Sequence, residues 1–355
     1  MELAGLTDMG KNRKRNEDTF FCERKENGQI LAVVIDGCGG HQAGDVCARI
    51  VKEEMHKWME NHDTENLGFC LKEAAVHANS VVMLEKEANP ELSDMCCVMT
   101  AVIVDTPKKQ IHMVHVGDSR LYAYLDGRLV KLSHDHSPVG ELEEKGYLTE
   151  EEAMNHINRN RVRRAIGTKE LDINTEYLEC KTFPIAPGIG WLLCSDGLTD
   201  MITSAQIGEI LCEQVSLEKQ ACNLVQAANE AGGKDNITVV LVQDTSLPDG
   251  TTEELFLSLG KPTGVCRKTT TEIEDEGVVL ELVETTPLAT PQPEITKKNK
   301  FCIGWIYAFA ALVFLLCTVT VCLVVHQKME QYQQQELYRQ NQELLKSLYY
   351  NINNR

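Results

Sequence analysis

Four short segments share one design, in which an apolar run carries an aspartate at its end, beside a glycine, a serine or an asparagine. They are Val33–Gly37, Val116–Ser119, Leu193–Gly197 and Gly233–Ile237. A buried strand holds a terminal carboxylate rigidly, and a small neighbour lets backbone or water approach it. One aspartate at a strand end is usually a turn former. Four such ends, joined by Glu17-Asp18 near the start, predict carboxylates that converge in one cleft.

Convergent carboxylates point to a particular chemistry. They repel one another and stay partly protonated unless a cation neutralises them. Oxygen ligands without a histidine or cysteine cluster select hard divalent ions, Mg²⁺ or Mn²⁺, over Zn²⁺. Two such ions bridged by a carboxylate can lower the pKa of a shared water and orient it for in-line attack. The pattern therefore indicates phosphoester hydrolysis.

The secondary-structure pattern of the first two-thirds of the chain is that of a globular domain. We expect strands and helices in clusters, which favours an α+β fold with antiparallel sheets over a doubly wound parallel sheet. The expected strands are Ile30–Ile35, Met99–Val104, Ile111–Val116, Leu121–Tyr124, Trp191–Cys194 and Ile237–Val242. The expected helices are Ala43–Glu60, Leu67–Lys86, Ala205–Gln214 and Leu217–Ala231.

Composition excludes one class of function and indicates the cellular compartment. The chain has 355 residues and a formal net charge of −18, which argues against a nucleic-acid binder, because phosphate backbones are bound by clustered lysine and arginine. Its 14 cysteines are scattered through apolar segments without a CxxC pair, as expected of small buried residues in a reducing compartment. The N-terminus lacks a signal-peptide pattern, so we expect the first domain, residues 1–245, to stay in the cytoplasm.

The remaining residues read as a tether and an anchor. Nine acidic and three basic residues between Asp249 and Thr285 predict an acidic flexible linker over residues 246–300. No charged residue occurs in the 25 positions of residues 301–325, which is enough to cross a hydrocarbon core of about 30 Å as one transmembrane helix. Residues 326–355 form a tail rich in Gln and Glu, in which leucines at near-helical spacing allow a short helix and weak self-association.

Several motifs, in order, resemble the metal-dependent protein phosphatase family, also called protein phosphatase 2C, in its bacterial type. The resemblance extends over about two-thirds of the chain, from Leu3 to Val242. Its motifs are Thr7–Gly10 with Arg13 and Asn16–Asp18, Asp36–His41 with Gly44, Val116–Arg120, Asp135–Ser137, Arg159–Asn160 with Ala165–Gly167, Ser195–Leu198, and Asp235–Thr238.

The resemblance implies a fold, a cofactor and a set of roles. The fold would be a four-layer α/β/β/α sandwich of two antiparallel sheets flanked by helix pairs. Two Mn²⁺ or Mg²⁺ ions would lie at one end, and a third, weaker ion is implied in bacterial-type members. Asp36 would bridge two ions, and Asp118 would bind the third. The other implied metal ligands are Asp18, the Gly37 carbonyl, Asp196 and Asp235.

The resemblance also implies roles around the metals. Arg13 would bind the substrate phosphate, because a guanidinium fork matches two phosphate oxygens, although composition alone would make it a surface residue of the basic run Lys11–Arg15. Glu17 would support metal-bound waters from a second layer, with Asn236 beside it. His41 is a candidate general acid, and a hydrogen bond within its own loop is the alternative.

The sequence departs from the family pattern at two places. Cys38 stands where some members carry a histidine directly after the Asp-Gly pair. The segment Asp94–Val98 replaces a strand entry that is usually rich in glycine and contains threonine. The basic cluster of Arg159, Arg161, Arg163 and Arg164 falls where the family has a flap; it could attract acidic phosphopeptides, although solvated charge is the usual explanation.

The sequence therefore predicts a membrane-anchored phosphatase that hydrolyses phosphoserine and phosphothreonine by attack of a metal-bridging water. Its partners would be phosphorylated proteins, the substrates of a serine/threonine kinase, and the membrane, but no nucleic acid. It would span the membrane once, with the catalytic domain in the cytoplasm. A catalytically silent phosphoprotein-binding module and an unrelated two-metal hydrolase are the alternatives. The first is disfavoured because all acidic ligands are present, and the second because the motifs match one family.

Overall fold

The computed structural model describes residues 1–39, 43–62 and 64–263. In this part of the chain ten strands form two five-stranded sheets, and all paired strands are antiparallel. The first sheet consists, in spatial order, of β1 (Glu2–Asp8), β10 (Ile237–Gln243), β9 (Gly190–Cys194), β6 (Arg120–Leu125) and β7 (Arg128–Lys131). The second consists of β2 (Asp18–Arg24), β3 (Ile30–Cys38), β4 (Cys96–Asp105), β5 (Gln110–Val116) and β8 (Glu179–Pro184).

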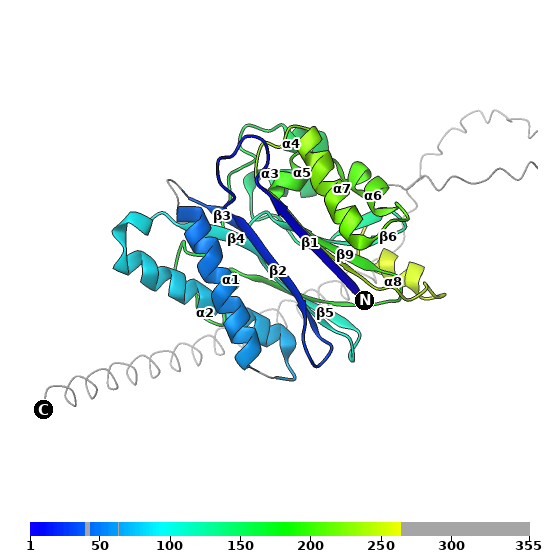
Figure 1. The fold of residues 1–355 in the computed structure, drawn as a ribbon, viewed down its shortest axis with the longest axis horizontal. Coiled ribbons are helices and arrows are strands. Elements are labelled where there is room, and N and C mark those ends of the chain that lie inside the picture. Colours follow the sequence, from blue (N-terminus) through cyan, green and yellow to red (C-terminus); the bar gives the residue numbers. More distant parts are fainter. Residues whose placement is uncertain (40–42, 63, 264–355) are drawn as a thin grey trace, which may run out of the picture. The chain divides into compact units, whose positions relative to one another are not determined.

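Helices cover the outer face of each sheet (Figure 1). On the second sheet lie α1 (Ala43–Asn61) and α2 (Leu67–Ala88). On the first lie α5 (Asp196–Thr199), α6 (Ser204–Leu211) and α7 (Leu217–Glu230). The remaining elements are the 3₁₀ helix η1 (Pro90–Leu92) and the helices α3 (Pro138–Glu144), α4 (Glu150–Met154) and α8 (Thr252–Ser258).

Strand β3 shows why the sheets are buried on both faces. Successive strand residues point to opposite faces. Accordingly Leu31 and Val33 pack under α1 and α2, whereas Ala32 and Val34 face the other sheet. Because both faces are apolar, β3 reads in the sequence as a continuous apolar run and not as an alternating one.

The predicted α+β arrangement of antiparallel sheets is confirmed, and all expected strands and helices are present within a few residues of their expected ends. Strands β1, β2, β7 and β8 were not expected from the sequence pattern. All four lie at sheet edges in the spatial order. In β8 intermediate and exposed residues alternate, so the strand lacks the apolar run that marks a buried one.

One prediction differs from the structure at the start of the linker, residues 246–300. Helix α8 lies in this region, and its Phe256 is fully buried in the core between the two sheets. Thr263 then forms an isolated β-bridge with Leu129. The ordered domain therefore continues beyond residue 245, at least to residue 263, because one aromatic side chain ties an otherwise acidic segment to the core.

Within residues 1–39, 43–62 and 64–263 no helix is long and apolar enough to span a membrane. The predicted transmembrane segment, residues 301–325, and the predicted tail, residues 326–355, lie outside the described residues.

Candidate active site

Asp18 and Asp36 stand opposite each other at one end of the second sheet. They are direct cross-strand partners in the β2–β3 pair. The Asp18 Oδ2 atom accepts hydrogen bonds from the hydroxyl groups of Ser195, at 2.8 Å, and Thr238, at 2.7 Å. Ser195 directly follows β9 and Thr238 lies in β10, so this carboxylate joins the two sheets at the end where the strand-terminal aspartates gather.

The five carboxylates of the predicted ligand set lie close enough for their charges to interact. Burial is the largest cause that raises the pKa of Asp36, and the charges of Asp18, Asp196, Asp118 and Asp235 raise it further. Asp18 lies in β2, and Asp196 is the first residue of α5. Asp118 lies in the β5–β6 connection, and Asp235 lies two residues before β10. The predicted convergence of strand ends is therefore present in the fold.

The donor chemistry of this cluster fits a hard divalent cation. Burial, the largest cause, raises the pKa of Asp18 to about 6 and that of Asp118 to about 7, and neighbouring aspartates contribute in the same direction. Such groups are costly to ionise side by side, and a dication offsets that cost. Every side chain of the predicted ligand set offers oxygen, the ligand type that Mg²⁺ and Mn²⁺ prefer.

Gly37 is packed tightly between two segments of the site. Its N–H donates to the Glu17 carbonyl over 3.2 Å. A Cβ atom built on Gly37 would lie 2.4 Å from the Gly44 carbonyl oxygen and 2.6 Å from that of Glu17. Any side chain here would displace the backbone, which explains why glycine follows Asp36 directly.

Asn236 anchors the loop that carries Glu17 and Arg13. Its Oδ1 atom accepts from the Glu17 N–H at 2.9 Å, and its Nδ2 group donates to the Met9 and Arg15 carbonyls at 2.9 Å each. The side chain is buried and uses both ends of the amide. The predicted supporting role of Asn236 thus has a physical form, because it fixes the backbone of this loop.

Arg13 lies at the edge of the carboxylate cluster. Its Nη2 atom donates to Asp235 Oδ2 at 2.7 Å, its Nη1 atom is 3.9 Å from Glu17 Oε2, and the side chain is 44% exposed. A guanidinium in this position faces solvent and the acidic cluster at once. It can therefore contact an anion that approaches metal ions held there.

Two histidines, the buried His115 and the half-buried His136, hold the peptide before Asp118. The Gly117 N–H donates to His136 Nδ1 at 3.0 Å, while the Gly117 carbonyl accepts from the His136 N–H at 2.6 Å and from His115 Nε2 at 3.2 Å. Gly117 has a φ of +111°, and a Cβ there would lie 2.2 Å from Val98 Cβ. Ligand atoms of His115, His136 and Glu179 also lie within 4.8 Å of one another. Since these contacts already fix the peptide, we assign the histidines to positioning Asp118.

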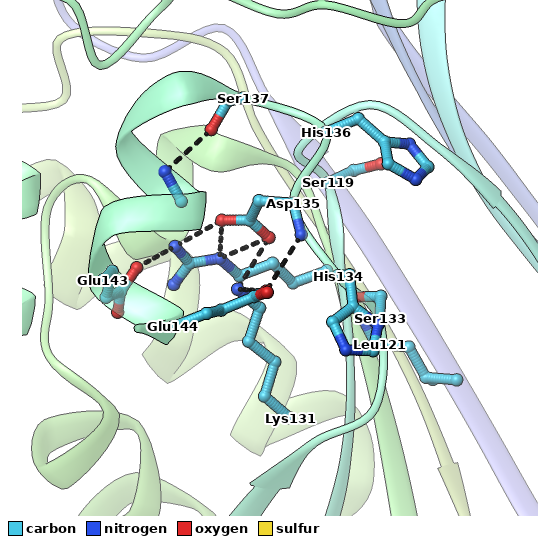
Figure 2. Close-up of polar contacts among 12 residues, drawn as sticks. Ser119, Leu121, Lys131, Ser133, His134, Asp135, His136, Ser137, Glu143 and Glu144 are labelled. Carbon is cyan, nitrogen blue, oxygen red and sulfur yellow. Dashed lines mark hydrogen bonds and ion pairs between the residues drawn. The ribbon is translucent and has the colours of Figure 1, made fainter. Parts of the chain in front are cut away.

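A network of ion pairs and hydrogen bonds around Asp135 supports the segment next to Asp118 (Figure 2). Asp135 receives hydrogen bonds from Arg120 Nε and Nη2 at 2.7–3.2 Å and pairs with Lys131 at 2.8 Å. Arg120 also reaches Glu143 at 2.8 Å. Burial alone would raise the pKa of Asp135, but the charges of Arg120 and Lys131 outweigh it and lower the pKa to about 2. The network ties α3 to β6, two residues from Asp118.

Asp200 belongs to the site although the sequence analysis did not select it. It lies four residues after Asp196, accepts from Arg159 Nε at 2.9 Å, and lines one cavity together with Asp118. Its pKa is raised to about 6, first by burial, although Arg159 acts against the shift. The sequence signal was the spacing of four residues from Asp196, which places two carboxylates on one side of a helical turn.

The remaining candidates are only partly placed. His41 lies outside the described residues. In the basic cluster, Arg159 pairs with Asp200 and Arg163 with Glu141, while Arg164 donates to the backbone. Three of the four cluster arginines are thus bonded within the protein and are not simply solvated charge.

Comparison with known proteins identifies the family of this chain. The model of the protein phosphatase 2C family matches residues 9–241. The chain belongs to the protein phosphatase 2C family. The chain is 34% identical over 255 residues to the serine/threonine phosphatase stp of Listeria welshimeri, and the match covers 70% of this chain and 98% of the relative.

Solved structures agree with this assignment. The chain matches the structure of the Mycobacterium tuberculosis serine/threonine phosphatase PstP/Ppp with a TM-score of 0.61 and 30% identity, and the match covers 69% of this chain and 99% of that one. It also matches the catalytic domain of PstP in complex with two manganese ions, with a TM-score of 0.58, 29% identity and coverage of 68% and 96%. The predicted class of enzyme, a metal-dependent serine/threonine phosphatase and hence a hydrolase, is confirmed at the level of the family.

Proposed function

We propose that this chain hydrolyses phosphoserine and phosphothreonine in phosphorylated proteins, the products of serine/threonine kinases, with two Mn²⁺ or Mg²⁺ ions. The carrying observation is the convergence of carboxylates from both sheets, joined through the Asp18–Ser195 hydrogen bond. Asp36 would help to hold these ions, and Asp118 would help to hold a third. The other ligands would be Asp18, the Gly37 carbonyl, Asp196 and Asp235.

Other residues of the chain would bind the phosphate and support the water. When bound, the ions supply a water of lowered pKa and neutralise phosphate charge. Arg13 holds phosphate oxygens with its fork and so orients the phosphorus for in-line attack. Glu17, whose Oε2 atom lies 3.9 Å from Arg13 Nη1, would support the metal-bound waters by accepting hydrogen bonds from them. Asn236 fixes the loop that carries both. His41 stays a candidate general acid, with a hydrogen bond within its own loop as the alternative.

The test is Mn²⁺-dependent release of phosphate from a phosphothreonine peptide by the full chain. Asp36→Asn should abolish release, because an amide cannot balance a pair of dications, while circular dichroism stays unchanged. Asp172→Asn removes one charge from an exposed position and is the matched control. Peptide binding without release in the unmodified chain would support the phosphoprotein-binding module. Full activity of Asp36→Asn would refute the metal assignment.

We also propose that residues 301–325 cross the membrane once and keep the phosphatase domain in the cytoplasm. The support is the run of 25 uncharged residues, which is long enough to cross the hydrocarbon core as a helix. Protease added outside intact cells should then cleave only the tail, residues 326–355. Digestion of the catalytic domain under those conditions would contradict this orientation. Self-association through the tail predicts a cross-linked dimer that is lost when residues 326–355 are deleted.

A further inference from the structure

Cys38 and Cys96 face each other at the metal-binding end of the second sheet. They are direct cross-strand partners where β3 pairs with β4. Their sulfur atoms lie 2.8 Å apart, and the Cys96 thiol also donates to the Cys38 carbonyl at 3.0 Å. Both are free thiols and both are partly exposed. Directly opposed residues of antiparallel strands have Cα atoms about 4.5–5.5 Å apart, within the range that a disulfide spans.

The two positions are also the two departures that the sequence shows from its family pattern, Cys38 after the Asp-Gly pair and Cys96 in the replaced strand entry. The structure shows that these departures meet. Two thiols 58 positions apart in the chain are in direct contact, so they can act as a pair and not only as independent small residues.

The pair is coupled to the metal site through tightly packed backbone. Cys38 follows Gly37, whose position leaves no room for a Cβ atom on the sides of Gly44 and Glu17. Gly39, on the other side, lies against Asp94, since a Cβ there would be 2.8 Å from the Asp94 carbonyl oxygen. Close-packed interiors transmit a displacement instead of absorbing it. A movement of the Cys38 backbone therefore reaches Asp36 and the Gly37 carbonyl.

We propose that Cys38 and Cys96 form a reversible disulfide under oxidation by hydrogen peroxide, and that this cross-link weakens metal binding and lowers the phosphatase activity. The inference rests on the proposed function for its effect on activity, but the cross-link itself does not. Bond formation would shorten the sulfur separation from 2.8 Å to about 2.05 Å. The resulting shift acts on the backbone next to Asp36.

The chemistry requires one equivalent of peroxide. One thiolate attacks a peroxide oxygen, so that an S–O bond forms, the O–O bond breaks and hydroxide leaves. The second sulfur then attacks the sulfenic sulfur, forming the S–S bond while hydroxide leaves and takes up the thiol proton as water. The two sulfur atoms together lose two electrons, which the two peroxide oxygens gain. A dithiol reductant reverses the step by thiol–disulfide exchange.

The first experiment maps the cross-link. The full chain, free of metal, is treated with hydrogen peroxide, the remaining thiols are alkylated, and the digest is analysed by mass spectrometry. We expect one linked peptide pair that contains Cys38 and Cys96 and that disappears with dithiothreitol. Cys180→Ser and Cys222→Ser, which remove exposed free thiols, are controls that should retain the linked pair. Absence of the linked pair in the unmodified chain overturns the inference.

The second experiment measures its consequence. After peroxide is removed, Mn²⁺ binding by calorimetry should be about tenfold weaker than in the reduced chain, and dithiothreitol should restore it. Cys96→Ser should bind Mn²⁺ as the reduced chain does and should not respond to peroxide. Cys38→Ser is the second variant if Cys96→Ser does not fold. Unchanged Mn²⁺ affinity in the cross-linked chain, or a peroxide response that persists in these variants, would overturn the regulatory effect.

The activity assay separates this inference from the proposed function. If the reduced chain hydrolyses a phosphothreonine peptide with Mn²⁺ but forms no cross-link, the redox inference fails alone. If the reduced chain is inactive, the proposed function fails, and the cross-link and the calorimetry still decide whether the thiol pair responds to peroxide and controls the metal site.

Discussion

The Ser195 hydroxyl donates to Asp18 Oδ2 over 2.8 Å and thereby joins the ends of the two sheets at the carboxylate cluster. Both side chains are buried, and Ser195 Oγ also accepts from the Thr238 N–H at 3.0 Å. The serine therefore satisfies groups on both sheets at once. It orients a proposed metal ligand without being one itself.

Replacement of Ser195 tests this link. In Ser195→Ala the Asp18 carboxylate keeps Thr238 as a partner but loses one donor, and the Thr238 N–H loses its acceptor. We expect Mn²⁺ affinity to fall about 10–100-fold, as for other residues that support metal ligands. The free energy of unfolding should fall by about 1–3 kcal/mol. Calorimetry with Mn²⁺ and urea denaturation measure the two effects. Ser246→Ala, at an exposed position, should change neither, and wild-type Mn²⁺ affinity in Ser195→Ala would contradict the role.

Arg13 is predicted to act on the substrate and not on the fold. Arg13→Ala should raise KM for a phosphothreonine peptide and lower kcat/KM about tenfold, a loss of about 1.5 kcal/mol for one charge-assisted bond at a half-exposed site. Steady-state kinetics measure it. Arg15→Ala removes an exposed charge from the same basic run and is the matched control. An equal loss in both variants would mean that the run acts by its net charge.

The sequence could predict those parts of the site that depend on local pattern. Apolar runs that end in Asp36, Asp118 and Asp196 mark buried strands, and buried strands fix their terminal side chains. Clustering of strands and helices was enough for the α+β class. The structure places these carboxylates together, as the pattern indicated.

The parts that depend on tertiary contacts were beyond such reasoning. The partnership of Ser195 with Asp18 joins residues 177 positions apart. Asp200 carries no strand signal of its own, and its role follows from the cavity that it lines. The Cys38–Cys96 contact requires the β3–β4 register. Helix α8 was missed because its acidic composition hides a single buried anchor, Phe256.

The stabilising effect of Mn²⁺ should increase with pH. Without metal, burial chiefly raises the pKa of Asp18 to about 6 and that of Asp118 to about 7, whereas an unfolded aspartate titrates near about 3.9. Between about pH 4 and about pH 7 the folded state therefore binds more protons than the unfolded state. These groups therefore stabilise the metal-free fold fully below about pH 4, and this contribution is lost as pH rises through 6 to 7.

Metal reverses that loss, because a dication binds the ionised carboxylates and competes with protons. Thermal unfolding at about pH 5.5 and about pH 7.5, with and without Mn²⁺, should show the larger increase in Tm at the higher pH. His115 and His136, whose pKa values burial lowers, favour the fold at higher pH in both samples. The comparison at each pH removes their contribution. An Mn²⁺ effect that is equal at both values would contradict the carboxylate assignment.

Helix α8 should contribute to the stability of the phosphatase domain through Phe256. This side chain is fully buried in the core between the sheets, Arg128 lies over its ring at 5.3 Å, and Arg128 also pairs with Glu253 at 2.6 Å. Phe256→Ala should lower the free energy of unfolding by about 3–5 kcal/mol, because it leaves a cavity in a core that cannot collapse around it. Leu257, its neighbour on the same helix, is 49% exposed.

Leu257→Ala is therefore the matched control and should lower the free energy of unfolding by less than about 1 kcal/mol in urea denaturation.

The same contacts of α8 predict how truncated chains behave. A chain that ends at residue 263 keeps Phe256 and the bridge between Thr263 and Leu129, whereas a chain that ends at residue 245 exposes the apolar surface that Phe256 covers. The longer form should unfold at the higher Tm and aggregate less. Equal Tm values for the two forms, together with a small effect of Phe256→Ala, would show that α8 rests on the domain without stabilising it.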